Sequence, residues 1–148
     1  MSRRVLLVSI LVLSFLGLAD SWYLAQSALT DTALTCGIES LNGCNTVAQS
    51  EYSNLFGVPL ALYGVAFYAI IFIAAAFLLT NTRAWLVRLL FLATVVGFLA
   101  SLYFLYLQVF LIKALCIYCL ASFVFSVLLF LAAWRFKARE TLTSSVVP

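Results

Sequence analysis

Four apolar segments, each close to twenty residues long, constrain the fold of this chain more than any other feature. A transmembrane α-helix needs about 20 consecutive apolar residues. Only 9% of the 148 residues are charged, whereas about 25% is usual in soluble domains. The sequence therefore predicts an all-α membrane protein, a four-transmembrane-helix bundle forming a single membrane-embedded domain over residues 1–148. The predicted spans are Val5–Ala25, Val58–Leu79, Ala84–Leu107 and Leu115–Trp134.

The distribution of basic residues predicts the orientation of this bundle. With four spans, seven of the eight basic residues fall on one side, and the eighth, Lys113, falls on the other. The positive-inside rule then places both termini in the cytoplasm, with the long loop 26–57 and every cysteine outside. The net charge of +3 reflects this bias, and no separate basic patch suggests nucleic-acid binding. The seven residues are Arg3, Arg4, Arg83, Arg88, Arg135, Lys137 and Arg139.

A cleaved signal peptide is the alternative interpretation of the first segment. Arg3 and Arg4 precede an apolar run, and residues 25–28 include small side chains suited to cleavage. Three spans would then remain, and the cysteines would still share one face of the membrane.

The four cysteines form two pairs on the same predicted membrane face. Cys36 and Cys44 lie in the long loop, whereas Cys116 and Cys119 lie at the start of the last span. Residues three apart on a helix project from one side, so the second pair forms a local dithiol. Disulfides persist outside the cytoplasm. The chain contains no histidine, which excludes a Cys–His nucleophile or a mixed Cys/His zinc site, and leaves a four-cysteine zinc site as an alternative.

Location indicates what these dithiols can do. Free N–H groups at a helix N-terminus favour a thiolate, and Lys113, one turn earlier, would add to this effect. A loop dithiol can meet a water-soluble protein, a helix-end dithiol can meet an acceptor dissolved in lipid, and thiol–disulfide exchange can connect them. No metal or flavin motif is present, so we expect the acceptor to be a quinone. The alternative is that the cysteines are small apolar side chains that only pack.

Several further residues are candidates for supporting roles. Asp20 lies near the outer end of the first span, and a carboxylate inside a membrane segment is a functional candidate; alternatively, it only bonds a neighbouring helix. Aromatic residues near Cys119 could line a quinone site, although such residues also serve helix packing. They are Tyr103, Tyr118 and Phe123.

Four elements follow one another along the chain in a specific order. The first two are the end of the first span and the loop cysteines. The third is a loop serine followed by the entry to the second helix, and the fourth is the third helix with the Cys-x-x-Cys motif. These elements are Ser21-Trp22-Tyr23-Leu24; Cys36 and Cys44; Ser50 with Leu55–Leu60; and Ser101-Leu102-Tyr103, Gln108, Lys113 and Cys116-Ile117-Tyr118-Cys119. In this combination the sequence resembles the bacterial form of the vitamin K epoxide reductase family.

The resemblance implies a role for each cysteine pair. Cys116 and Cys119 would form the active-site disulfide, with Cys119 nearest the quinone and forming the adduct. Cys36 and Cys44 would be a shuttle pair that receives electrons from a thioredoxin-fold partner and relays them to Cys116. Ser50 would hold the loop near the redox centre. The acceptor would be ubiquinone, menaquinone or a vitamin K-type naphthoquinone, without metal or flavin.

Two departures from the family pattern refine this expectation. Many bacterial members carry a fused thioredoxin-like domain, whereas this chain ends at Pro148, so we expect a separate DsbA-like partner. The vertebrate enzymes have a tyrosine four residues after the second active-site cysteine, where this chain has Phe123. That difference favours an ordinary quinone over vitamin K epoxide. The expected location is a bacterial cytoplasmic membrane, with the cysteines facing the extracytoplasmic side.

The hypothesis is therefore a membrane thiol:quinone oxidoreductase that reoxidises a disulfide-forming partner. A DsbB-type oxidase would perform the same reaction but normally carries its Cys-x-x-Cys in the first outer loop, the reverse of the order here. A vitamin K epoxide or quinone reductase working in the reducing direction would use the same residues. A non-enzymatic membrane protein stapled by structural disulfides is the alternative from another class.

Overall fold

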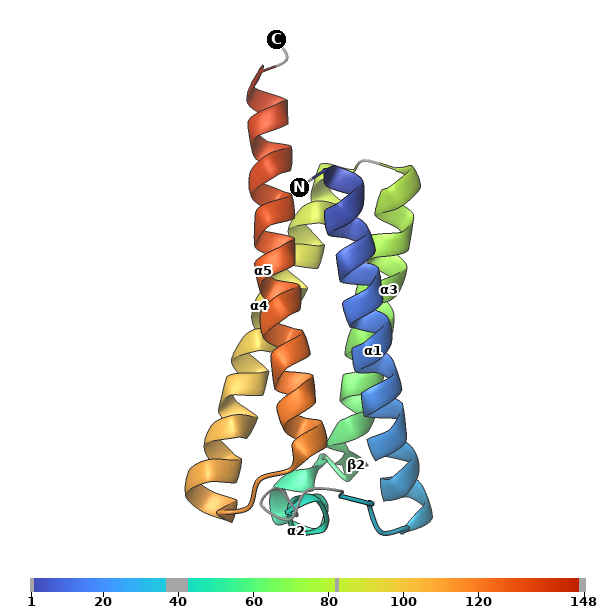
Figure 1. Ribbon diagram of the computed structural model, residues 1–148, viewed down its shortest axis with the longest axis vertical. Helices are drawn as coiled ribbons and strands as arrows, with labels where there is room; N and C mark the ends of the chain where they lie inside the picture. Colours follow the sequence, from blue (N-terminus) through green and yellow to red (C-terminus); the bar gives the residue numbers. More distant parts are fainter. Residues whose placement is uncertain (1, 37–42, 82, 147–148) are drawn as a thin grey trace.

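The computed structural model describes residues 2–36, 43–81 and 83–146, and its main feature is a bundle of long helices (Figure 1). Four of the helices in the described residues are long and apolar enough to cross a membrane, which confirms the predicted four-helix architecture. Both termini and the connection between α3 and α4 lie at one end of the bundle, and the long loop lies at the other (Figure 1). The helices are α1 (Arg3–Thr30), α3 (Leu60–Thr80), α4 (Ala84–Tyr106), extended by the π-helical turn η3 (Leu107–Ile112), and α5 (Ile117–Val146).

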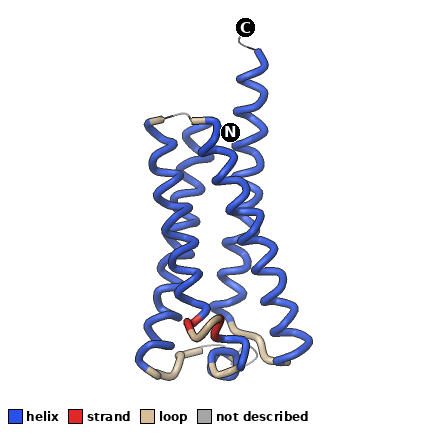
Figure 2. Tube along the Cα trace, turned by 180° about the vertical axis from the view of Figure 1, so that it is seen from behind, coloured by secondary structure: helices blue, strands red, loops and turns tan. Residues whose placement is uncertain are grey.

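The observed helix ends differ from the expected span limits where polar residues prolong a helix. α1 passes the expected limit at Ala25 and ends at Thr30, where Asp31 forms the C-cap with a left-handed φ of 49°. α5 begins at Ile117 and continues past Trp134 through a charged segment, so that it projects beyond the other helices (Figures 1 and 2). Hydropathy reports where a helix is apolar, whereas hydrogen bonding decides where it ends.

The second span begins later than expected because its first residues belong to a hairpin. Strand β1 (Asn54–Leu55) pairs antiparallel with β2 (Val58–Pro59). The two turn residues have positive φ angles, 53° at Phe56 and 78° at Gly57, as a two-residue primed hairpin turn requires. Pro59 therefore ends a strand and precedes α3, instead of lying inside its first turn.

The remaining loop elements cover the end of the bundle opposite the termini. The short helix α2 (Cys44–Ala48) and the 3₁₀ turn η2 (Glu51–Ser53) precede the hairpin. They lie across the helix ends, close to the start of α5 (Figures 1 and 2). This arrangement brings the loop cysteines and the helix-end cysteines to the same end of the molecule.

Helix α1 lies at the centre of the packing. It packs against α3 and α5, and α5 also packs against α4. Arg3 fixes the terminal end, because its guanidinium pairs with Glu140 on α5 at 2.9 Å and donates to the carbonyl of Leu78 on α3 at 2.6 Å. Large apolar side chains such as Ile73 and Val96 remain exposed on the outside, which suits contact with lipid tails that are as apolar as leucine.

Glycine allows α1 and α3 to approach closely at one point. A Cβ atom built on Gly17 would lie 2.3 Å from Cε1 of Tyr68. The ring of Tyr68 is almost completely buried and its hydroxyl is hydrogen-bonded to α5, so it has little freedom to move aside. Small residues commonly serve such contacts between membrane helices.

We expect Gly17→Val to destabilise the bundle by about 1–3 kcal/mol, because the added atoms overpack the contact with Tyr68. Ala19→Val, on the exposed side of the same helix, is the matched control and should change stability little. Reversible unfolding of both variants in detergent measures the difference. Equal stability of the two variants would contradict the close packing.

Candidate functional site

A disulfide in the loop is the first component of the site. Cys36 and Cys44 are disulfide-bonded, with their Cα atoms 6.6 Å apart. Cys44 is 0% exposed, whereas Cys36 is partly exposed. Asn45 holds the loop segment that leads to Cys36: its Oδ1 accepts from the N–H of Leu34 at 2.8 Å, and its Nδ2 donates to the carbonyl of Leu34 at 3.2 Å. The side-chain amide of Asn45 thus pairs with both backbone groups of Leu34, as a neighbouring strand would. Because Asn45 follows Cys44 and Leu34 lies two residues before Cys36, this pairing helps to hold the disulfide in position.

The loop docks directly against the start of α5. The N–H of Gly43 donates to the carbonyl of Leu115 at 3.1 Å, so the residue before Cys44 is bonded to the residue before Cys116. A Cβ atom on Gly43 would lie 2.8 Å from the Cβ of Ala114 and from backbone atoms of Leu115. No side chain fits at this position, and only glycine permits the contact.

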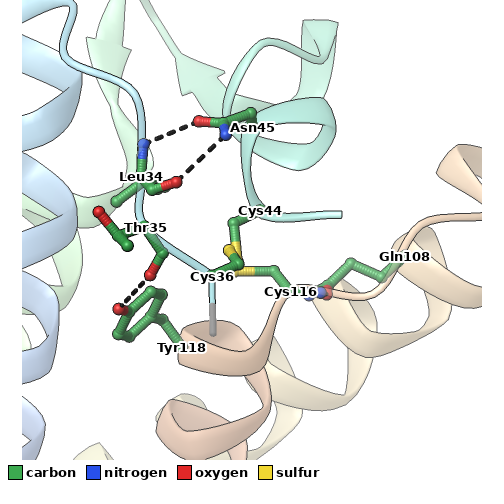
Figure 3. The surroundings of a disulfide bond; sticks show 8 residues. All are labelled: Leu34, Thr35, Cys36, Cys44, Asn45, Gln108, Cys116 and Tyr118. Carbon is green, nitrogen blue, oxygen red and sulfur yellow. Dashed lines mark hydrogen bonds between the residues drawn. A yellow bond between two sulfur atoms is a disulfide. The ribbon is translucent and has the colours of Figure 1, made fainter. Parts of the chain in front are cut away.

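Docking places the two cysteine pairs together, as thiol–disulfide exchange between them requires. Leu34, Cys44 and Cys116 form one buried cluster, and Cys36 and Cys119 pack against it. Figure 3 shows the side chain of Cys116 directed toward the loop disulfide. Cys116 and Cys119 are free thiols. The structure therefore holds an oxidised loop pair beside a reduced helix-end pair.

Gln108 organises the connection that carries Cys116. It lies in the π-helical turn η3 and is only 4% exposed. Its backbone carbonyl accepts from the N–H groups of Lys113 and Ala114, and its side-chain Oε1 accepts from the N–H of Cys116 at 3.1 Å (Figure 3). π-Helical turns occur frequently at functional sites. In the sequence, Gln108 stood out only through the family resemblance, and nothing indicated this contact.

The environment of Cys116 favours a thiolate. A hydrogen bond with the thiol of Cys119 lowers the pKa of Cys116 to about 7, against the opposing effect of burial, and the N–H groups of Cys119 and Tyr118 at the start of α5 lower it further. A thiol with a pKa near neutrality is an effective nucleophile in disulfide exchange. Lys113 was expected to help stabilise this thiolate. Within the described residues, no hydrogen bond or ion pair joins Lys113 to Cys116, so no direct contact supports that role.

A cavity of about 960 Å³ lies beside both cysteine pairs. Its lining includes Cys44, Cys116, Cys119, Ser50 and Phe123, together with many apolar side chains from the loop and from the membrane helices. Mostly apolar cavities with a few convergent polar groups are typical small-molecule sites. A quinone ring, which is flat and apolar apart from its two oxygens, fits this donor set because one wall carries a reactive thiol.

The aromatic residues expected around the quinone have different positions. Phe123 lines the cavity. Tyr118 does not: its hydroxyl donates to the carbonyl of Thr35 at 2.8 Å, and its ring lies 5.1 Å from that of Tyr23, so it ties α5 to the loop. Tyr103 is 56% exposed and packs edge-on against Phe104 outside the cavity.

Asp20 and Ser50, the expected supporting residues, differ in their surroundings. Ser50 lines the cavity and donates its hydroxyl to the carbonyl of Val47 at 2.7 Å, which holds the loop. Oδ2 of Asp20 is buried and is the one buried side-chain oxygen or nitrogen without a hydrogen-bond partner among the described residues. Asp20 lies within electrostatic range of Cys116 and Cys119. No group of three or more potential metal ligands occurs in the described part of the chain.

Gln108→Leu should lower stability by about 1–3 kcal/mol, because the buried N–H of Cys116 loses its acceptor. It should also slow exchange between Cys116 and the loop disulfide, because the thiol is no longer held in place. Unfolding in detergent and the rate of internal thiol exchange measure both effects. Gln26→Leu, at an exposed position on α1, is the matched control, and an equal response of the two variants would contradict the positioning role.

In a Cys36→Ser/Cys44→Ser background, alkylation of Cys116 should reach half its maximal rate near pH 7, because only the thiolate reacts. Cys119→Ala removes the hydrogen-bond donor, so the midpoint should rise toward the ordinary value of 9.0. Cys119→Ser keeps a donor and should produce a smaller rise. Peptide mapping of the alkylated protein locates the label. A midpoint that stays near 7 after Cys119→Ala would refute this account.

Comparison with known proteins agrees with the geometry of the site. The model of the vitamin K epoxide reductase family matches residues 8–134, which is most of the chain and includes all four cysteines. A search of curated proteins finds no match. Members of this family are membrane redox enzymes that use cysteines and a quinone.

Proposed function

We propose that this chain, which belongs to the vitamin K epoxide reductase family, is a membrane thiol:quinone oxidoreductase that reoxidises a thioredoxin-fold, disulfide-forming protein. The observation that carries this proposal is the docking of an oxidised loop pair against the reduced Cys116 and Cys119 at the edge of a large cavity. Electron pairs would pass from the partner to Cys36 and Cys44, then to Cys116 and Cys119, and finally to the quinone.

The internal step is an exchange between the two pairs. A loop thiolate attacks the sulfur of Cys116 in the Cys116–Cys119 disulfide, and the thiolate of Cys119 leaves. The second loop thiolate then attacks the mixed disulfide and releases Cys116. Two electrons and two protons have moved from the loop dithiol to the helix-end pair, which leaves the loop oxidised and Cys116 and Cys119 reduced, the combination present in the structure.

Burial divides the work between the two loop cysteines. Cys36 is partly exposed, so a partner thiolate in water can attack its sulfur and displace the thiolate of Cys44. The partner's second thiol then attacks the partner sulfur of this mixed disulfide, which releases Cys36 and leaves the partner oxidised. Cys44 is fully buried in one cluster with Cys116, which suits it to the internal exchange. We therefore assign Cys36 to the partner and Cys44 to Cys116.

Delivery to the quinone falls to Cys119, which lines the cavity on the membrane side of Cys116. Oxidation of the two thiols to a disulfide releases two electrons and two protons, and the quinone takes up both as it becomes a hydroquinone. Asp20 supports the proton transfer in this proposal, because its unpaired buried oxygen lies within electrostatic range of both thiols. Buried carboxylates in membrane segments commonly take part in proton relays.

The choice of partner and direction rests on sequence and geometry together. The positive-inside rule supports an extracytoplasmic position for the loop in a bacterial cytoplasmic membrane, where a separate DsbA-like protein would meet Cys36. The family match supports this arrangement over that of a DsbB-type oxidase. Phe123 on the cavity wall offers no hydroxyl to an epoxide oxygen, which supports ubiquinone or menaquinone as acceptor. Reduction of a vitamin K-type substrate would use the same residues and needs a direct assay.

Purified protein in lipid vesicles should reduce a short-chain quinone when it is supplied with a reduced DsbA-like protein. Cys119→Ala should reduce this turnover to background and accumulate a Cys44–Cys116 mixed disulfide, because the resolving thiol is missing. Quinone absorbance gives the rate, and peptide mapping gives the linkage.

The loop variants provide the internal control for this experiment. Cys36→Ala and Cys44→Ala should lose partner-driven turnover but retain reduction driven by a small dithiol, which can reach the Cys116–Cys119 disulfide directly. Full turnover by Cys119→Ala would refute the assignment. Turnover with vitamin K epoxide but with no quinone would instead establish the reducing direction.

A further inference from the structure

Four hydroxyl groups form a hydrogen-bonded cluster inside the bundle. The hydroxyl of Tyr68 on α3 donates to the carbonyl of Ser122 at 3.0 Å and lies 2.8 Å from Oγ of Ser122 and 3.3 Å from Oγ of Ser126, both on α5. Ser101 on α4 donates to Oγ of Ser126 at 2.9 Å. The cluster therefore joins three membrane-spanning helices, and all four residues line the cavity that contains Cys119.

The cluster lies directly inward from the reactive thiol. Cys119, Ser122 and Ser126 are spaced by three and four residues, so they occupy one face of α5. Because α5 runs from the loop end into the bundle (Figure 1), Ser122 lies one turn deeper than Cys119, a rise of roughly 4.5 Å. That separation is comparable to the width of a six-membered ring, so a ring beside Cys119 would present its far side to Ser122.

The hydrogens of this cluster can reorient without movement of heavy atoms. A hydroxyl group can act as donor or as acceptor. When the single hydrogen of Tyr68 turns from the backbone carbonyl of Ser122 to Oγ of Ser122, the hydrogen of Ser122 is free to bond a carbonyl oxygen in the cavity. When Ser122 donates to Tyr68 instead, its lone pair can accept from a ligand hydroxyl. One arrangement of atoms can thus pair with both the oxidised and the reduced form of a quinone.

Two other buried hydroxyls of the bundle, those of Ser14 and Thr94, lack these properties. Ser14 and Thr94 bond carbonyls of their own helices, at 3.0 Å to Leu11 and 2.7 Å to Phe91, and neither lines the cavity. Such local bonds only satisfy the side chain. The Tyr68 cluster instead crosses between helices, and the contact of its ring with Gly17 holds it in place.

We propose that Ser122, oriented by Tyr68, binds the quinone oxygen that lies farther from Cys119, and that Ser126 and Ser101 complete this cradle. The proposal rests on the proposed function and names the polar contacts of its quinone site. Phe123, the neighbouring wall residue, has no group that could replace them. The Cys119 thiol and the cradle would hold opposite sides of the ring and so align it for reduction.

Quinone binding without turnover tests the cradle separately from the relay. In a Cys119→Ala background, Ser122→Ala and Tyr68→Phe should each raise the Kd for a short-chain quinone about 3–10-fold, the effect of one neutral hydrogen bond. Ser122→Thr keeps the hydroxyl and should retain the original Kd. Ser14→Ala is the matched control for loss of a buried hydroxyl and should leave the Kd unchanged.

Kinetics of the protein with all four cysteines provide the second readout. Ser122→Ala should raise the KM for quinone by a similar factor and leave thiol exchange between the partner and Cys36 unchanged. If Tyr68→Phe fails to fold, Ser122→Ala decides alone, because alanine is a good helix former. An unchanged Kd in Ser122→Ala, or an equal rise in Ser14→Ala, would overturn the cradle, whereas failure of the proposed function would show as full turnover by Cys119→Ala.

Discussion

The hydrogen bond from the N–H of Gly43 to the carbonyl of Leu115 is the contact on which the arrangement of the site depends. Each of its residues immediately precedes a cysteine, so one backbone contact sets the distance between Cys44 and Cys116. A loop that only tethered its cysteines would bring the pairs together rarely, because closing a long loop costs conformational entropy. Docking removes most of that cost in advance. The missing side chain at position 43 is part of this contact, since a Cβ atom would meet the backbone of Leu115.

The bilayer imposes the second constraint. Backbone groups in the hydrocarbon region need internal partners, and irregular backbone is tolerated only where protein buries it or where it lines a cavity. Between two such spans, the connection from α4 to α5 satisfies its backbone groups through Gln108, whose two carbonyl groups accept from the N–H groups of Lys113, Ala114 and Cys116. Through these bonds, Gln108 allows the helix formed by α4 and η3 to end and the chain to turn. The next helix, α5, then begins directly after Cys116. The same N-terminus stabilises the thiolate of Cys116.

The apolar spans could be predicted from the sequence, whereas the contacts of Gly43 and Gln108 could not. The four spans and the two cysteine pairs were predictable because each is a local pattern, in length of apolar run or in spacing. The role of Gln108 was not, since one polar residue in an apolar segment has no periodicity and its partner is set by a π-helical turn. The cluster of Tyr68 with Ser122 joins residues 54 positions apart, so only the packing of the helices reveals it. The hairpin at Val58–Pro59 was missed because apolar strand residues resemble the start of a span.

Exposure then orders the steps of the proposed relay. In the proposed relay, a water-soluble thiol meets the partly exposed Cys36 and the acceptor meets Cys119 in the cavity, whereas Cys44 and Cys116, which line the same cavity, are buried. Electrons that enter at Cys36 would then pass through the buried Cys44 and Cys116 before they reach the acceptor at Cys119. In this proposal no cysteine meets both the partner and the quinone, because Cys36 does not line the cavity and Cys119 does. A protein with two fully exposed dithiols could perform the same exchanges in any order. In the proposed relay, the burial of Cys44 beside Cys116 makes the loop disulfide an intermediate between the partner and the helix-end pair.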